Sequence, residues 1–120
     1  MSYNITGTKL YKLDLKIKKE DMKGLVKELG GWLDFRMDVD GNWNFDVCEG
    51  EIHGHTDGDF FVFDKLSPYG EGSGTAWMDY VKPLLEKTTG EFKMRFVWEG
   101  GDSISMVECN DGSITEKDVD

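Results

Sequence analysis

Two histidines separated by one residue are the side chains best suited to chemistry in this 120-residue chain. His53 and His55 lie at i and i+2, which places both imidazoles on one side of a strand, with Glu51 beside them. Imidazoles at this spacing can hold zinc or a redox metal if further ligands arrive from elsewhere in the fold. Asp57 and Asp59 follow closely, but the chain has no third histidine. A small metal- or ligand-binding domain centred on His53 and His55 is one hypothesis, and a solvated histidine pair near a turn is the simpler interpretation.

A run of oxygen-bearing side chains matches the spacing of a calcium-binding loop. Positions 1, 3, 5, 9 and 12 of that template are filled by Asp38, Asp40, Asn42, Asp46 and Glu49. Position 6 of the template is a glycine that turns sharply, whereas this chain has Trp43 there. The flanking residues also alternate as strands do, instead of repeating with helical spacing. The sequence therefore predicts an acidic hairpin, with no calcium and no other cofactor.

Charge is strongly segregated along the chain, whose formal net charge is −10. Residues 1–33 carry seven Lys and four acidic residues, whereas residues 34–79 carry two basic residues and eleven acidic ones. This balance disfavours direct binding to nucleic acid, which requires a basic surface, and favours a partner protein with a basic surface. The densest acidic stretch is opposed by Arg36 alone and comprises Asp34, Asp38, Asp40, Asp46, Glu49, Glu51, Asp57, Asp59 and Asp64. We expect the first eight of these acidic residues to bind the partner.

The sequence carries no catalytic signature. Neither Cys48 nor Cys109 has a histidine and an acid close by in sequence, and no serine lies in a nucleophile elbow. The glycine-rich stretch 70–74 contains Glu71 and is followed by no lysine, so its charge is wrong for cradling phosphates. We therefore expect no enzyme. No apolar run is long enough to span a membrane and no secretion signal begins the chain, so we predict a cytoplasmic protein with reduced thiols.

Hydrophobic alternation predicts a hairpin inside the acidic region. Apolar residues alternate over 33–39 and again over 43–47. A three-residue loop, Asp40-Gly41-Asn42, would pair Val39 with Trp43 and keep every apolar side chain on one face. Asn42 would then adopt the left-handed conformation, which asparagine tolerates better than most residues.

Similar patterns predict the remaining elements. Strands are expected at 9–18, 60–63 (buried on both faces), 92–98, 104–107 and, as a short last strand, 113–115. Helical spacing is found around 20–29 and again around 75–85, where Thr75 should cap the helix and Pro83 should kink it.

These elements predict a single α+β domain over residues 1–120. It should contain one mainly antiparallel sheet of about five to six strands, with two helices packed on one face. Residues 68–74 hold three Gly and a Pro and are the best candidate for a mobile loop. Residues 116–120 are expected to form a frayed, charged tail.

In size, acidity, lack of an export signal and α+β pattern, the whole chain resembles the small inhibitor proteins of phages and mobile elements. Anti-CRISPR proteins and toxin-immunity proteins belong to this class. The resemblance implies stoichiometric inhibition of a larger protein with a basic surface, without chemistry.

An acidic strand face suits such a role. Side chains on one face recur about every 7 Å, close to the phosphate spacing along one nucleic-acid strand. We therefore expect a non-enzymatic inhibitor that docks its acidic surface onto the nucleic-acid-binding site of a partner enzyme. A structural subunit of a larger assembly is a third hypothesis, and a homo-oligomer is compatible with the sequence.

Overall fold

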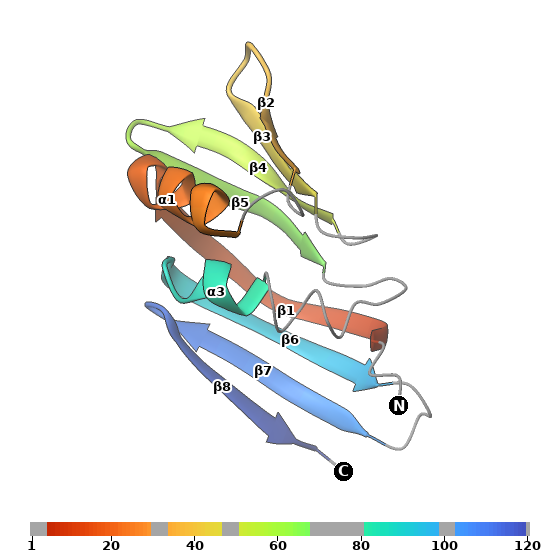
Figure 1. The fold of residues 1–120 in the computed structure, drawn as a ribbon. Coiled ribbons are helices and arrows are strands. Elements are labelled where there is room, and N and C mark those ends of the chain that lie inside the picture. The colour runs from red at the N-terminus through yellow and green to blue at the C-terminus, as the bar shows by residue number, and fades with distance from the viewer. Residues whose placement is uncertain (1–4, 30–33, 47–50, 68–80, 99–102, 120) are drawn as a thin grey trace.

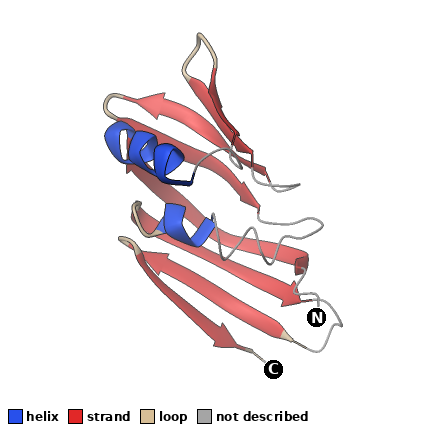
Figure 2. Cartoon of the chain, viewed as in Figure 1, coloured by secondary structure: helices blue, strands red, loops and turns tan. Residues whose placement is uncertain are grey.

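The chain folds around one large antiparallel sheet. The computed structural model describes residues 5–29, 34–46, 51–67, 81–98 and 103–119. Within them, eight strands pair in the order β2-β3-β4-β5-β1-β6-β7-β8 (Figure 1). The helical residues described are confined to two short helices, so the described chain is mostly sheet (Figure 2). The predicted architecture, five to six strands with two helices packed on one face, is therefore wrong.

The longest strand occupies the centre of the sheet. β1 (Ile5–Lys18) pairs with β5 (Phe60–Ser67) on one side and with β6 (Thr89–Trp98) on the other. Beyond β5, a meander of short connections places three strands: β4 (Glu51–Asp57), β3 (Asn42–Asp46) and β2 (Asp34–Met37). Beyond β6 lie β7 (Ile104–Asn110) and β8 (Ser113–Asp118).

The two helices belong to the long connections of the fold. α1 (Lys19–Leu29) follows β1, and the chain then reaches β2 at the far edge of the sheet (Figure 1). α3 (Lys82–Leu85) precedes β6 and returns the chain to the centre. α3 has Pro83 near its described start, but Val81 before it is also helical and the residues preceding Val81 lie outside the described ranges, so the kink expected at Pro83 stays a prediction. The expected cap at Thr75 and the loop 68–74 lie outside the described residues.

The core lies on one face of the sheet. Alternate residues of the strands, such as Leu15 and Phe96, point into it and are almost fully buried. The helices contribute Met22 and Leu85 to the same hydrophobic cluster. Each side chain of this size contributes about 1.5–3 kcal/mol when fully buried. The opposite face, called the outer face here, carries the other residues of each strand and is mainly polar.

Strand β4 was expected around His53 and His55 but was left out of the strands predicted from apolar alternation, because its core-facing residues carry little apolar bulk. Ile52, Gly54 and Thr56 point inwards, so only one large apolar side chain marks the pattern. At the other edge, β8 runs to Asp118 and pairs with β7. Residues 116–118, which were expected in the frayed tail, are therefore part of the sheet.

Strand β5 is buried on one face only, in contrast to the prediction for 60–63. Phe61 and Phe63 point into the core, whereas Phe60 and Val62 are only half-buried on the outer face. The Lys16 ammonium lies 4.3 Å from the centre of the Phe60 ring, a cation–π contact across β1 and β5.

Candidate partner-binding surface

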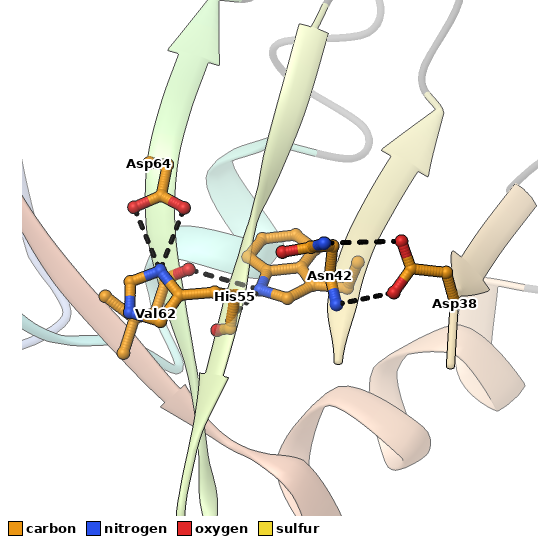
Figure 3. A network of polar contacts seen from close by, with 6 residues as sticks. Asp38, Asn42, His55, Val62 and Asp64 are labelled. Carbon is orange, nitrogen blue, oxygen red and sulfur yellow. Dashed lines mark hydrogen bonds and ion pairs between the residues drawn. The ribbon is translucent and has the colours of Figure 1, made fainter. Parts of the chain in front are cut away.

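The β2–β3 hairpin ends in an acidic turn that is closed by hydrogen bonds. The Asp38 carboxylate accepts hydrogen bonds from the backbone N–H of Asp40 (2.9 Å) and of Asn42 (3.0 Å). Its second oxygen accepts a bond from the side-chain amide of Asn42 (3.3 Å; Figure 3). The N–H of Asn42 lowers the pKa of the Asp38 carboxyl, because these donors favour its charged form. Asp38, the first residue of the calcium-loop spacing, therefore caps a turn by accepting hydrogen bonds from the backbone of Asp40 and Asn42.

The hairpin register differs from the predicted one by two residues. Met37 pairs with Trp43 and Phe35 with Phe45, and the loop is Val39-Asp40-Gly41. Gly41, with φ of 84°, takes the left-handed position that was assigned to Asn42. Glycine meets no steric penalty there, whereas asparagine does. A shift of two residues leaves every apolar side chain on the predicted face, so alternation alone does not distinguish the two registers.

A second acidic turn lies beside the first. Asn42 pairs with His55, and a Cβ added to Gly41 would lie 2.3 Å from the Thr56 hydroxyl oxygen, so the β2–β3 turn touches the end of β4. Both turns lie at the same end of the sheet (Figure 1). We call this end the acidic turn end, formed by residues 38–41 and 57–59. Of the eight acidic residues predicted to bind a partner, it brings together Asp38, Asp40, Asp57 and Asp59.

The remaining predicted residues lie toward the opposite end of the same strands. Asp34 pairs with Asp46 across β2 and β3, and Asp34 is held by the Arg36 guanidinium, with its Nε 2.7 Å from the carboxylate. Glu51 forms an ion pair with Lys65, which lowers the pKa of the glutamate. The side chain of Asp46 and all of Glu49 lie outside the described residues.

The eight acidic residues therefore do not line one continuous strand face. Between the two groups the outer face carries the polar side chains of Asn42, Asn44, His53 and His55, with the Asp64 carboxylate against His55. At the far end, Arg36 and Lys65 neutralise two of the carboxylates. By contrast, no ion pair within the described residues involves the side chains of Asp40, Asp57 or Asp59. Asp59, however, lines a pocket together with Lys18, Lys19 and Lys23, so the carboxylates of this end that lie apart from such a lysine cluster are those of Asp40 and Asp57.

The two histidines share the outer face, as predicted, but one of them is already engaged. A bulge in the β4–β5 pair places Asp64 opposite no residue of β4, and its carboxylate lies 2.8 Å from Nδ1 of His55 (Figure 3). Among the described residues there is no group of three His, Cys, Asp or Glu side chains placed to hold a metal. The metal hypothesis therefore gains no third ligand from the described part of the fold.

The sequence pattern missed two exposed apolar residues, one in the acidic turn end and one directly before it. Val39 is fully exposed (101%) and Met37 is about half exposed (56%). Both belong to the alternation that predicted a core face, and Val39 was expected to pair with Trp43. In the structure the tip of the β2–β3 hairpin projects beyond the neighbouring strands (Figure 1), and both side chains are exposed to solvent. The predicted register concealed the exposure of Val39 because it paired Val39 with Trp43. In the observed register Val39 lies in the loop and has no partner across the hairpin.

Comparisons with known proteins assign no function to this surface. No protein-family model matches the chain, and neither a curated protein nor a solved structure matches it at a significant level. No helix in the described residues is long and apolar enough to cross a membrane. The function must therefore be inferred from the side chains themselves.

Proposed function

We propose that the protein is a non-enzymatic binding protein that docks its acidic turn end onto the basic surface of a larger protein. The observation that carries this proposal is the exposure of Val39 between two aspartates, at a turn that is already closed by hydrogen bonds. Because the Asp38 carboxylate and Gly41 already fix the loop, little conformational entropy is lost on docking.

Charge and apolar area have separate roles in such an interface. The carboxylates of Asp40, Asp57 and Asp59 attract a basic surface and speed its association. Val39 and Met37 supply the apolar contact that stays dry at the centre of a protein interface, where methionine is enriched. This surface replaces the strand-face mimicry expected from the sequence, because the acids cluster at turns instead of along one strand.

The consequence for the partner is inhibition. A basic protein surface often serves to bind nucleic acid, and a rigid acidic hairpin placed on it excludes that ligand. The class resemblance to anti-CRISPR and immunity proteins suggests the same stoichiometric mode of action. We place this activity in the cytoplasm, where such partners act.

The test is affinity capture from a native host lysate with a matched pair of charge-reversal variants. The first variant changes Asp40, Asp57 and Asp59 to Lys and leaves Asp38, which caps the turn. The second changes three exposed acids elsewhere, Glu28, Glu86 and Asp118, to Lys and therefore has the same net charge.

We expect one stoichiometric partner that is retained by the second variant and lost by the first. Val39→Ser should also weaken binding, by about tenfold, since it removes an apolar contact but no charge. Equal loss in both charge variants would assign the binding to net charge alone and contradict the proposal. Binding that survives the first variant, at low and moderate salt alike, would contradict it as well.

A further inference from the structure

The basic residues of the first quarter of the chain meet other basic residues on the outer face. Lys9 lies directly opposite Arg95 in the β1–β6 pair, and Lys12 lies directly opposite Lys93. A bulge between Leu10 and Lys12 makes this possible, because it returns Lys12 to the same face as Lys9. Like charges directly opposite each other destabilise a sheet. Two such pairs side by side therefore require a compensating interaction.

Only one of these two pairs is compensated within the described residues. Lys12 forms an ion pair with Glu91, and Lys93 lies 3.3 Å from a carboxylate oxygen of Glu108. No ion pair within the described part of the chain involves Lys9 or Arg95. The Lys9 ammonium lies 5.4 Å from the centre of the Tyr11 ring, a contact that leaves the positive charge in place.

Arg95 carries a second unmet requirement. Its Nε atom is buried and has no hydrogen-bond partner, and it is the only such side-chain nitrogen or oxygen among the described residues. The guanidinium stays protonated, and its planar fork matches the oxygens of a carboxylate or a phosphate. A buried donor without a partner is unusual in a folded protein and calls for an explanation.

A third cation extends this pair across the sheet. Met106 of β7 lies opposite Arg95 on one side and opposite Lys117 of β8 on the other. The row Lys9–Arg95–Met106–Lys117 thus crosses four neighbouring strands, a width of about 15 Å, and contains no carboxylate. Lys117, like Lys9, is exposed and takes part in no ion pair between described residues. We call Lys9, Arg95 and Lys117 the basic row.

We propose that the basic row binds a compact oxyanion, a phosphate or carboxylate group carried by a small ligand. Because Nε itself is covered, the two terminal nitrogens of the Arg95 guanidinium supply the forked donor that holds the anion, and Lys9 and Lys117 flank it as point charges. The ligand is compact because the net charge of −10 repels a long polyanion, whereas one or two charges suffice to fill this row. The basic row lies in the half of the sheet away from the acidic turn end, so this site does not depend on the proposed function.

The chain offers a direct probe because it contains only two arginines, Arg36 and Arg95. Each gives its own Nε–H signal in a ¹⁵N-correlated NMR spectrum. Nε of Arg36 already donates to Asp34, and it serves as the internal control. Titration with inorganic phosphate at constant ionic strength, and separately with citrate, should move the Arg95 signal to saturation and leave the Arg36 signal in place.

Three variants assign the effect to the basic row. Arg95→Lys keeps the charge but removes the fork, and should weaken phosphate binding about tenfold or more. Lys9→Gln should weaken it several-fold, whereas Lys27→Gln, an exposed lysine of α1, should leave it unchanged. Amide dispersion in the same spectra verifies that each variant is folded.

Three results would overturn the proposal. Parallel, non-saturating shifts of both arginine signals, or equal weakening by Lys27→Gln, would show that the anion only screens the surface. A short single-stranded DNA that displaces phosphate at much lower concentration would assign the row to nucleic acid instead of a compact ligand. Saturation by citrate but not phosphate, or the reverse, would support the site and tell which oxyanion it prefers.

Discussion

Trp43 and Gly54 lie directly opposite each other in the β3–β4 pair, and the missing side chain of the glycine makes room for the indole. The indole Nε1–H of Trp43 donates to the carbonyl oxygens of His55 (3.2 Å) and Val62 (3.1 Å). The largest side chain of this half of the core thereby finds a hydrogen-bond partner although it is buried.

Gly54→Ala should destabilise the protein strongly. A Cβ at this position would lie 1.7 Å from the Val62 carbonyl oxygen and 3.0 Å from Nε1 of Trp43, so the backbone of β5 would have to move. We expect a loss of about 3 kcal/mol or more in the free energy of unfolding, measured by urea denaturation. Gly24→Ala is the matched control: it lies in α1 with nothing within 4 Å and should stabilise the protein by about 0.5–1 kcal/mol. Similar effects of the two changes would contradict the observed β3–β4 packing.

Phe45→Ala and Met37→Ala should differ greatly although both residues belong to one alternating pattern. Phe45 is fully buried, and its truncation should cost about 3–5 kcal/mol. Met37 is about half exposed (56%) near the hairpin tip, and its truncation should cost less than about 1 kcal/mol. Comparison of the urea midpoints of the two variants checks this. A large cost at Met37 would mean that the hairpin tip is packed and would weaken the proposed docking surface.

Asp38→Asn should reduce stability near neutral pH and have a smaller effect in acid. The pKa of Asp38 is lower in the folded protein than its usual value of about 4, because the N–H of Asn42 and its neighbours bind the carboxylate. Its stabilisation is therefore fully present above about pH 4 and is lost as the pH falls through the folded pKa. The difference in Tm between wild type and Asp38→Asn should shrink between pH 6 and pH 3. The pKa of Glu51 is also lowered, but Glu51 is present in both proteins and its effect cancels in the comparison. A Tm difference that stays constant between pH 6 and pH 3 would contradict the capping role of Asp38.

Cys109 should be unreactive in the folded protein. Burial raises the pKa of its thiol, which also lies 3.7 Å from the Leu85 carbonyl oxygen as a hydrogen-bond donor. In a Cys48→Ser background, labelling by a thiol-specific disulfide reagent at pH 8 should be at least about tenfold slower than in urea. Equal rates with and without urea would show that the β6–β7–β8 half of the sheet opens readily.

Part of the hairpin could be predicted from sequence because alternation fixes parity. Phe35, Trp43 and Phe45 point to one side in any register that preserves this parity, and they do so in the structure. The loop itself could not be placed, since a shift of two residues leaves the pattern intact. The choice depends on the left-handed conformation of Gly41 and on the Asp38 cap, both of which arise from local geometry.

The fold class was mistaken for a related reason. Strand β4 has glycine and threonine at two core-facing positions, because Trp43 and the neighbouring strands fill that space. The apolar residues of one strand do not predict that strand when side chains of the neighbouring strands fill the core beside it. The tail residues 116–118 were likewise recognisable as a strand only through their pairing with β7.

The sequence by itself determined the composition of the candidate surface: an acidic stretch, a basic first quarter and two turns rich in aspartate. Only the tertiary structure decided which charges remain uncompensated. Lys65 is close in sequence to Asp64 but forms its ion pair with Glu51, and Arg36 neutralises Asp34. Asp40 and Asp57 are left without an ion pair among the described residues. Pairing of β1 with β6 likewise brought Lys9 opposite Arg95, across 86 positions of the chain. Charge is a property of each residue, whereas its compensation depends on contacts between distant strands, which no local pattern encodes.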